Sequence, residues 1–445
     1  MAERQLDFFA TLGMPPGREA PQRRRGAVPG FDVPQNRTVF APASGKLYVF
    51  TPASVEVRIG WPRPQAWRKT RRSPWWSHYR PDIRLPEGDL TSEIERISLP
   101  VEPSEDPGFE ALTPAQKAGI RIAARARLDW YASIPVEVRN AIAPFPSRHW
   151  HLLALIARCG PSALDLVRAS PALAFALASS WVFRPVRVQR PLRSARALLA
   201  AGRKQRDIQA WLGFQASEPA RRLLRKVVHD AIAISPLLYL REAMGDPVRM
   251  KFLAHLPQLN AEAIRIGTDA TLLAYVRPSF LDEVALSNRE FDRPHAAILL
   301  QDSVEMFRQL RPAAGGFPPV RHLAALTALH DSLVEDLNRL SPEHEDIEFP
   351  PPPVAGTATI VPICSGRDLV EEGRVQSNCV ASYWDRIAVR RYVYIYRVLA
   401  PERCTLSLTR VGIRWVPSEL RRACNLPVSE ATRRAVAAWI ASHAA

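Results

Sequence analysis

Residues Glu371–Tyr383 read EEGRVQSNCVASY and form the least generic stretch of the chain. They lie between a run of prolines and a tail rich in strand-forming residues. Ser365 is placed to cap a helix that leads into this stretch, and Gly373 is placed to end that helix. A second helix is expected over Cys379–Val389. The stretch therefore predicts two helical segments joined by a short polar turn.

Strand-forming residues surround this stretch and predict a small sheet. β-Branched and aromatic residues dominate the segments concerned, and turn residues separate them. Ser429 is placed to cap a last amphipathic helix. We therefore expect residues 357–445 to form a compact α+β module, with strands at Ile360–Ile363, Tyr392–Val398, Thr405–Thr409 and Val411–Val416.

The order of residues in this module resembles the PcfJ-like family. The family pattern combines an acidic-Gly pair, a Cys-Val pair after a polar residue, and a Tyr four residues after the Cys. A strand pair follows, its second strand opening with Thr, and then an Asn-containing loop precedes a terminal helix. The chain supplies these features at Glu372-Gly373, Asn378-Cys379-Val380, Tyr383, Tyr394–Arg397, Thr405-Leu406 and Asn425-Leu426-Pro427.

The chain departs from the family pattern at two places. Many members have His directly before the Cys, where this chain has Asn378. Members also tend to have a Gly shortly before the late Asn, where this chain has Arg422-Ala423. The first departure removes the histidine that a dyad with the neighbouring Cys379 would need.

The resemblance implies a biological context for the chain. PcfJ-like proteins occur largely in bacteria and on mobile elements such as plasmids. DNA transfer or processing is the setting that the resemblance implies. The partners it implies are nucleic acid and other proteins of a mobile element, and it implies no cofactor.

Cys379 is the candidate nucleophile of the module. A helix beginning near Asn378 would place the thiol beside unpaired amides at the positive end of the helix dipole, which lowers the pKa of a thiol. Tyr383 lies one turn further on the same face and could donate a hydrogen bond. Asn378, Thr405 and Asn425 could hold a carbonyl or a phosphate. These five residues form a candidate catalytic site, provided that a base approaches.

The alternative for these residues is a structural role. A buried free cysteine commonly acts as a small apolar packing residue. The histidines nearest in sequence are His344 and His443, and either would have to fold in. No metal site is expected, because no CxxC element links the four nearby cysteines, which are Cys364, Cys379, Cys404 and Cys424.

The N-terminal part differs in character from the rest. Residues 1–38 contain Pro, Gly and the basic run Arg23-Arg24-Arg25, and they are expected to be disordered. Residues 39–110 are expected to hold a short β-hairpin across Thr51–Ser54, a Trp/Arg-rich segment, and a linker over Asp82–Phe109.

The Trp/Arg-rich segment is Trp61–Arg80 (WPRPQAWRKTRRSPWWSHYR), which has no acidic residue. Aromatic faces stack on unpaired bases while Lys and Arg neutralise phosphates, so this mixture suits single-stranded nucleic acid. The alternative is that the Trp rings pack onto the helical body as a clasp, with the Arg side chains solvated around them. The candidate nucleic-acid-binding residues are Trp67, Arg68, Lys69, Arg71, Arg72, Trp75 and Trp76.

Residues 111–342 predict an almost entirely α-helical body. Thr113-Pro114 supplies an N-cap followed by proline at the first helical position. The charged and proline-rich segment 343–356 favours an extended spacer between this body and the C-terminal module. The last helix of the body carries a buried stripe of leucines at Leu323, Leu326, Leu329, Leu333, Leu337 and Leu340.

Two short patterns within the helical body suggest sites. Arg203–Val228 has the layout of a helix-turn-helix, with a Gly stop, a Ser start and four basic residues on the second helix. A plain helical hairpin has the same features and is the alternative. His330-Asp331 is a lone His-Asp pair, and without further ligands it does not predict a metal site.

The composition indicates which partners and which cellular compartment to expect. Lys and Arg number 60 against 44 Asp and Glu, a surplus that favours polyanionic partners such as nucleic acid or an anionic membrane surface. The alternative is the Arg-rich usage of a GC-rich genome.

No apolar run approaches the ~18 residues that a membrane-spanning helix needs, so no membrane insertion is expected. The N-terminus does not read as a secretory signal, and five cysteines fit a cytoplasmic protein.

The fold class expected is a predominantly α-helical body with a small C-terminal α+β domain. The function expected is that of a nucleic-acid-associated accessory protein of a bacterial mobile element. The basic surplus and the segment Trp61–Arg80 support it. Two alternatives stay open, namely an enzyme with a nucleophilic site at Cys379 and a helical scaffold for protein interactions.

Overall fold

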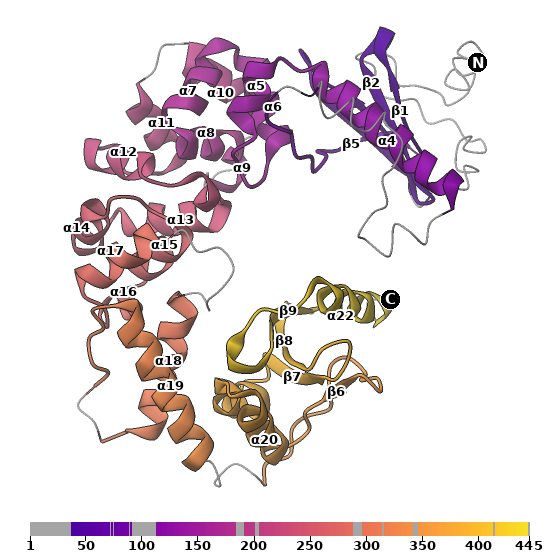
Figure 1. Cartoon of the computed structure of the whole chain (residues 1–445). Helices are drawn as coiled ribbons and strands as arrows, with labels where there is room; N and C mark the ends of the chain where they lie inside the picture. The colour runs from indigo at the N-terminus through magenta and orange to yellow at the C-terminus, as the bar shows by residue number, and fades with distance from the viewer. Residues whose placement is uncertain are drawn as a thin grey trace. The chain divides into compact units, whose positions relative to one another are not determined.

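The computed structural model forms two compact units, Met1–Pro247 (unit 1) and Val248–Ala445 (unit 2), shown in Figure 1. The boundary falls inside the helical body expected over 111–342. The disorder expected over 1–38 lies outside the described residues, except that Arg37 and Thr38 begin the first strand. The described residues are 37–71, 73, 75–88, 90, 113–183, 191–200, 204–287, 296–313, 316–340, 346–412 and 414–443.

Unit 1 begins with an antiparallel sheet in the order β1-β2-β3-β4-β5. The expected hairpin across Thr51–Ser54 is confirmed, since β2 and β3 pair and the Thr51 hydroxyl lies 2.9 Å from that of Ser54. The Trp/Arg-rich segment adds two further strands. The elements are β1 (Arg37–Ala41), η1 (Pro42–Ser44), β2 (Lys46–Phe50), β3 (Ser54–Ile59), β4 (Gln65–Thr70) and β5 (Ser77–His78).

A long helix, α4 (Pro114–Ala132), packs against β1 and β2. Its start is confirmed as a capping box, in which Thr113 and Gln116 each accept a hydrogen bond from the other's backbone amide. Near its other end, the buried Trp130 ring lies so close to Gly60 that a Cβ there would be 3.2 Å from it. Glycine at position 60 therefore lets the sheet and the helix approach each other.

Short helices make up the rest of unit 1, as the sequence predicts. Helix α8 is apolar on all sides, and every residue from Ala172 to Ala178 is buried, so it forms the centre of this array. The helices are α5 (Val136–Ile142), α6 (His149–Cys159), α7 (Pro161–Ala169), α8 (Pro171–Ala178), α9 (Ser180–Phe183), α10 (Pro191–Ala200), α11 (Gln205–Leu212), α12 (Glu218–Arg225), η2 (His229–Ala231) and α13 (Ile234–Ala243).

The first part of the expected linker packs onto this array, which corrects the prediction for residues 82–88. Ile83 and Leu85 are buried, and the Leu85 amide donates to His149 Nδ1 at 2.9 Å. The Arg139 guanidinium donates to the Gly88 carbonyl at 2.9 Å. Alternating apolar residues and these bonds hold the segment in place. Residues 91–110 of the expected linker lie outside the described residues.

The helix-turn-helix layout over 203–228 has the expected local geometry. Gly213 ends α11 in the left-handed conformation at φ 81°, and the Ser217 hydroxyl caps α12. Glu218 forms ion pairs with Arg221, Arg222 and Arg225. Because one carboxylate engages three of the four basic residues, the plain helical hairpin describes this segment best.

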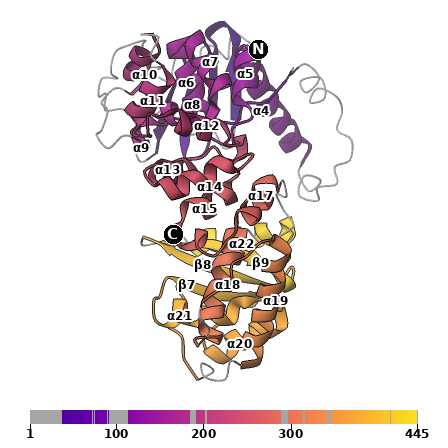
Figure 2. The same cartoon turned by 90° about the vertical axis from the view of Figure 1, so that its left-hand side faces the viewer.

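Unit 2 combines helices with an antiparallel sheet in the order β6-β7-β8-β9. Helices α18 and α19 lie against the C-terminal module, as Figure 2 shows. Its elements are α14 (Pro247–His255, which starts at the boundary), α15 (Ala261–Thr268), α16 (Ala270–Leu273), α17 (Pro278–Leu286), α18 (Ala296–Leu310), α19 (Leu323–Leu340), β6 (Ile360–Pro362), α20 (Gly366–Gln376), η3 (Cys379–Tyr383), α21 (Trp384–Ala388), β7 (Val393–Val398), β8 (Cys404–Val411), β9 (Arg414–Arg421), η4 (Ala423–Asn425) and α22 (Glu430–His443).

The structure confirms the expected fold class and corrects two details near the motif. Helix α20 does not end at Gly373 but continues to Gln376, where Ser377 adopts the left-handed conformation at φ 46°. The second segment is a 3₁₀ helix followed by a short α-helix, so it is more tightly wound than expected.

The described part of the proline-rich segment, residues 346–356, packs onto the sheet of unit 2. The Tyr394 hydroxyl donates to the Pro350 carbonyl at 3.0 Å, and the Tyr396 hydroxyl donates to the Val354 carbonyl at 2.8 Å. The segment is therefore packed onto the module, whereas the sequence predicted an extended spacer that separates the module from the helical body.

Candidate functional site

The five candidate residues of the C-terminal motif converge in unit 2. Asn378, Cys379, Tyr383, Thr405 and Asn425 all line one cavity of about 20 Å³. A neighbouring cavity of the same volume is lined by Cys379 and Asn425 together with residues of other helices. A volume of this size holds about one water molecule. The structure thus brings together the residues that the sequence singled out.

Local geometry explains how the chain places Cys379. After the left-handed Ser377, Asn378 caps the 3₁₀ helix by accepting a hydrogen bond from the Val380 amide at 3.1 Å. The Ser382 hydroxyl then donates to the Cys379 carbonyl at 2.8 Å. Cys379 therefore stands first in a tight turn whose backbone groups have partners, and its side chain points into the unit.

Asp302 of α18 is the partner that sequence reasoning missed. Its carboxylate accepts hydrogen bonds from the Cys379 thiol (3.8 Å), the Tyr383 hydroxyl (3.3 Å) and the Arg386 guanidinium (3.2 Å). Asp302 is 6% exposed, and the guanidinium of Arg386 also lies over the Tyr383 ring. The signal available in the sequence was an acidic residue, three positions before Glu305, in the mostly apolar stretch AAILLQDSVEMF.

The environment of Cys379 corrects the expected pKa of its thiol. Burial raises the pKa of the Cys379 thiol well above its usual value, and the nearby Asp302 carboxylate raises it further. Burial also raises the pKa of the Tyr383 hydroxyl. The turn is too short and too enclosed for its amides to offset these effects, so the thiol is protonated at neutral pH.

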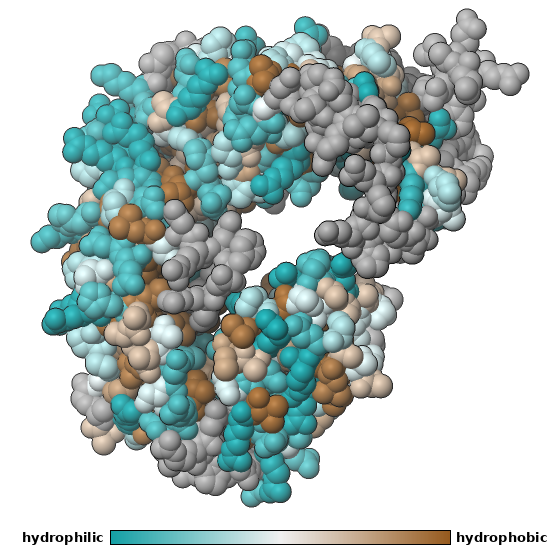
Figure 3. Space-filling view, viewed as in Figure 1, coloured by the Kyte–Doolittle hydropathy of each residue, from teal (hydrophilic) through white to brown (hydrophobic). Residues whose placement is uncertain are grey.

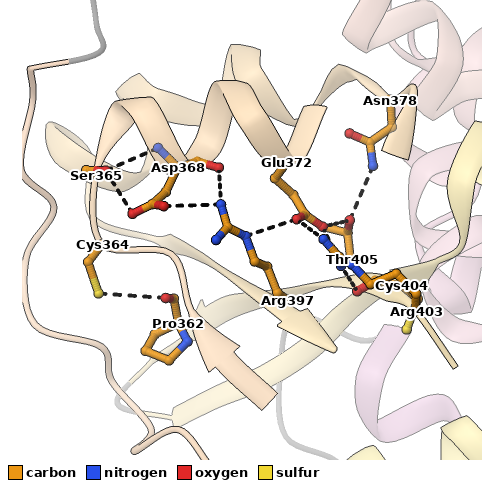
Figure 4. A network of polar contacts seen from close by, with 10 residues as sticks. All are labelled: Pro362, Cys364, Ser365, Asp368, Glu372, Asn378, Arg397, Arg403, Cys404 and Thr405. Carbon is orange, nitrogen blue, oxygen red and sulfur yellow. Dashed lines mark hydrogen bonds and ion pairs between the residues drawn. The ribbon is translucent and has the colours of Figure 1, made fainter. Parts of the chain in front are cut away.

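A second polar network surrounds Glu372 and is drawn in Figure 4. The fully buried Glu372 carboxylate accepts hydrogen bonds from the Thr405 hydroxyl (2.6 Å), from Arg397 (3.2 Å) and from Arg403 (3.0 Å). The Asn378 amide in turn donates to the Thr405 hydroxyl at 3.4 Å. The acidic residue of the motif therefore joins α20 to strands β7 and β8 and orients the motif asparagine.

His330 is the described histidine that shares a cavity with the thiol. It is 4% exposed on α19 and lines the second cavity together with Asp302 and Cys379. Burial lowers the pKa of His330, which keeps its ring neutral near pH 7. Its Nδ1 lies 3.5 Å from the carboxylate of its sequence neighbour Asp331, whose side chain is 70% exposed and does not line the cavity. The other histidines considered from the sequence, His344 and the side chain of His443, lie outside the described residues.

The described residues contain no cluster of three or more His, Cys, Asp or Glu side chains that could hold a metal ion. Of the four C-terminal cysteines, Cys364 and Cys424 are exposed whereas Cys379 and Cys404 are buried. Helices long and apolar enough to cross a membrane are likewise absent from the parts of the chain that the structure describes.

The basic aromatic segment of unit 1 is only partly available to a ligand. Lys69 is 6% exposed, and its ammonium lies 4.9 Å from the Trp76 ring centroid, so it is not free to neutralise a phosphate. Trp76 packs against the core cluster of the sheet, which consists of Tyr48, Phe50, Val55 and Val57. The buried Lys69 corrects the prediction, whereas Trp76 is partly buried and packs one side of its ring against the sheet.

The remaining candidates of this segment are more open. Arg68 and Arg71 are exposed, whereas Trp67 and Trp75 are half-buried. The Trp67 indole donates to the ring of the exposed His78 at 3.2 Å, which ties β4 to β5. Arg72 lies outside the described residues. The Trp rings therefore pack within the sheet more than onto the helical body.

The basic surplus of the chain is confined to one unit. Unit 1 has 37 Lys and Arg against 22 Asp and Glu, whereas unit 2 has 23 against 22. A genome-wide preference for arginine would raise both units alike. The asymmetry instead favours a polyanionic partner for unit 1.

Comparison of the chain with protein-family models, with curated proteins and with solved structures gave no match. The resemblance to the PcfJ-like family therefore stays a prediction that rests on the motif residues.

Proposed function

We propose that the protein binds single-stranded nucleic acid through unit 1 and acts as an accessory protein of a bacterial mobile element. The observation that carries this proposal is the confinement of the positive surplus to unit 1. Nucleic-acid backbones attract such a surplus because binding releases condensed counterions.

Exposed residues of unit 1 provide groups suited to binding single-stranded nucleic acid. Arg68 of β4 and Arg71, just after β4, are exposed, as is His78 of β5, while Trp67 of β4 is half-buried. Guanidinium groups bind phosphate oxygens, and aromatic rings stack on unpaired bases. The mobile-element context, with other proteins of the element as partners, comes from the motif resemblance and is part of the proposal.

The proposal is tested with the full-length protein and a fluorescently labelled single-stranded oligonucleotide. We expect the anisotropy to show binding that weakens by roughly 10³–10⁵ between 50 and 200 mM salt if about 6–10 phosphates are contacted. The proposal would be contradicted if the oligonucleotide did not bind at low salt, or if its affinity did not change with salt concentration.

A second candidate function is cysteine-centred catalysis in unit 2. One observation favours it, namely that Cys379, Asp302 and His330 line the same cavity. A neutral His330 could accept the thiol proton if substrate binding brought the two groups together. It ranks second because burial raises the thiol pKa and each cavity has a volume of only about 20 Å³.

The helical scaffold stays a prediction. A large exposed apolar groove would favour it. On the face drawn in Figure 3, the hydrophobic residues among those described are scattered between hydrophilic ones.

A further inference from the structure

Unit 1 contains a cavity of about 420 Å³, whose wall includes His78 of β5. Its wall combines residues at the start of β4 and at the end of β5 with residues of α6, α8 and α9. Ala154, Leu177 and Ala178 make part of the wall apolar. Cavities of roughly 300–1,000 Å³ with apolar walls and a few polar groups are typical of small-molecule sites.

Two buried polar side chains in this wall have no hydrogen-bond partner among the described residues. Both ring nitrogens of His151, which is 8% exposed, lack a partner, and so does the hydroxyl of Ser180, which is 1% exposed. A neutral imidazole carries one donor and one acceptor. Buried groups of this kind are normally paired, so a ligand that offers an acceptor next to a donor would satisfy them.

The protonation state of His151 fits this interpretation. Burial lowers the pKa of His151 to about 3, and the nearby charges of Arg80 and Arg148 lower it as well. The ring is therefore neutral at physiological pH and can both donate and accept.

An aromatic ring at the cavity is surrounded by positive charge. The Trp181 ring lies 4.8 Å from the His151 ring, 4.4 Å from the Arg80 guanidinium and 5.7 Å from the Arg148 guanidinium. Neither arginine has an ion-pair partner within the described part of the chain. Arg148 also adopts φ 65°, a conformation that non-glycine residues seldom take. Two guanidiniums without an ion-pair partner among the described residues, beside one ring, form a place for an anion next to a planar group.

We propose that this cavity binds one nucleotide, with its base against Trp181 and His151 and its phosphate at Arg80 and Arg148. The alternating donors and acceptors on the edge of a base match the unpaired groups of His151 and Ser180. Inorganic phosphate alone would leave most of the volume and the apolar wall unused. The nucleotide can be free in solution or an unpaired member of a bound strand, and the second case rests on the proposed function.

The first test measures binding of AMP, adenosine and inorganic phosphate to the full-length protein by calorimetry at low salt. We expect AMP to bind more tightly than either of its parts. Arg80→Gln should weaken AMP binding by about tenfold, the size of one charge-assisted hydrogen bond, and leave adenosine binding unchanged. His151→Phe should weaken both ligands.

The control variant is Arg206→Gln, which changes an exposed arginine of unit 1 that does not line the cavity. Arg80 is itself exposed, so its replacement tests the site without threatening the fold. The proposal is overturned if AMP does not bind at millimolar concentration, or if neither cavity variant changes AMP binding.

The second test adds a 5′-phosphorylated single-stranded oligonucleotide as competitor of AMP. Displacement of AMP, with weaker oligonucleotide binding in the cavity variants, would identify the ligand as a nucleotide of a strand. AMP binding without displacement would identify a free nucleotide. Salt-dependent oligonucleotide binding without any AMP binding would overturn the cavity proposal and leave the proposed function standing. AMP binding without oligonucleotide binding would support the cavity proposal and contradict the proposed function.

Discussion

Asp302 shows how one buried carboxylate fixes the chemistry of its neighbours. It accepts hydrogen bonds from Cys379, Tyr383 and Arg386, and its own charge faces the thiol. A helix start alone would have favoured the thiolate, but burial and a neighbouring negative charge both favour the neutral thiol. The local sequence pattern indicated the first effect only, because the residue that opposes it lies 77 positions away.

Cys379 should therefore resist alkylation in the native protein. With its pKa raised, the thiol should react with iodoacetamide more slowly than an ordinary cysteine at every pH below about 8.5. The exposed Cys364 and Cys424 serve as internal controls, and mass spectrometry reads each site separately. Selective reaction of Cys379 near neutral pH would refute this assignment and favour the catalytic alternative.

The buried His151 should make unit 1 sensitive to acid. Its pKa is about 3 in the folded protein and about 6.5 when unfolded, so the unfolded state binds the proton between these values. Stability is fully present above pH 6.5 and should fall with decreasing pH, by at most about 1.4 kcal/mol per pH unit.

Urea unfolding followed by tryptophan fluorescence between pH 7 and 4 measures this effect. His151→Gln should reduce the pH dependence, because glutamine does not titrate; burial also lowers the pKa of His149 and of His330, so part of the dependence should persist. His322→Gln, which replaces an exposed histidine of unit 2, is the control and should leave the dependence unchanged. Equal pH profiles for the wild type and His151→Gln would show that His151 does not take up the proton.

At the scale of elements, local signals predicted the starts of helices better than their ends. Thr113 and Ser365 cap their helices as expected, because a cap depends only on neighbouring residues. Gly373 does not end α20. The adjacent Glu372 is bound by arginines that lie on β7 and just before β8, and these long-range contacts hold the helix beyond the glycine.

Contacts between residues far apart in the sequence also limited the prediction of the candidate sites. All five motif residues meet at one cavity, so the motif was interpreted correctly as a spatial group. In contrast, the 420 Å³ cavity joins residues near Arg80 to Trp181 and His151, which no sequence spacing connects. The prediction for Lys69 was wrong because its position on an inward-facing side of β4 depends on the register of the sheet.

The link between α20 and β8 should depend on the Thr405 hydroxyl. Thr405→Val removes the 2.6 Å hydrogen bond to the buried Glu372 carboxylate and the hydrogen bond from Asn378. We expect a loss of about 1–3 kcal/mol in the free energy of unfolding of unit 2, the cost of leaving a buried acceptor short of a donor.

Thr409→Val is the matched control, since it makes the same change on the same strand at a more open position. It should change the free energy by less than about 0.5 kcal/mol. Denaturation monitored by hydrogen exchange of α20 amides reports the local effect. Equal stabilities of the two variants would show that the Glu372 network does not hold α20.

At the scale of the whole molecule, the two units differ in charge and in the kind of site they carry. Unit 1 holds the basic surplus and the large cavity that Arg80 lines. Unit 2 is nearly balanced in charge, and its motif is held by two buried carboxylates, Asp302 and Glu372, that form ion pairs with partly exposed arginines. This difference is the basis for the proposal that unit 1 binds the ligand, and it is consistent with a structural role for the motif of unit 2.

The most direct test of nucleic-acid binding is the salt dependence of single-strand affinity in charge-reversed variants of the full-length protein. Arg68→Glu with Arg71→Glu alters exposed residues of unit 1, and Arg265→Glu with Arg321→Glu makes the same change at exposed positions of unit 2. We predict that the unit 1 pair weakens binding and reduces the log–log salt slope by about 0.7 for each phosphate that the variant no longer neutralises, while the unit 2 pair leaves both unchanged. Equal effects of the two pairs, or no effect of either, would contradict the assignment of the nucleic-acid surface to unit 1.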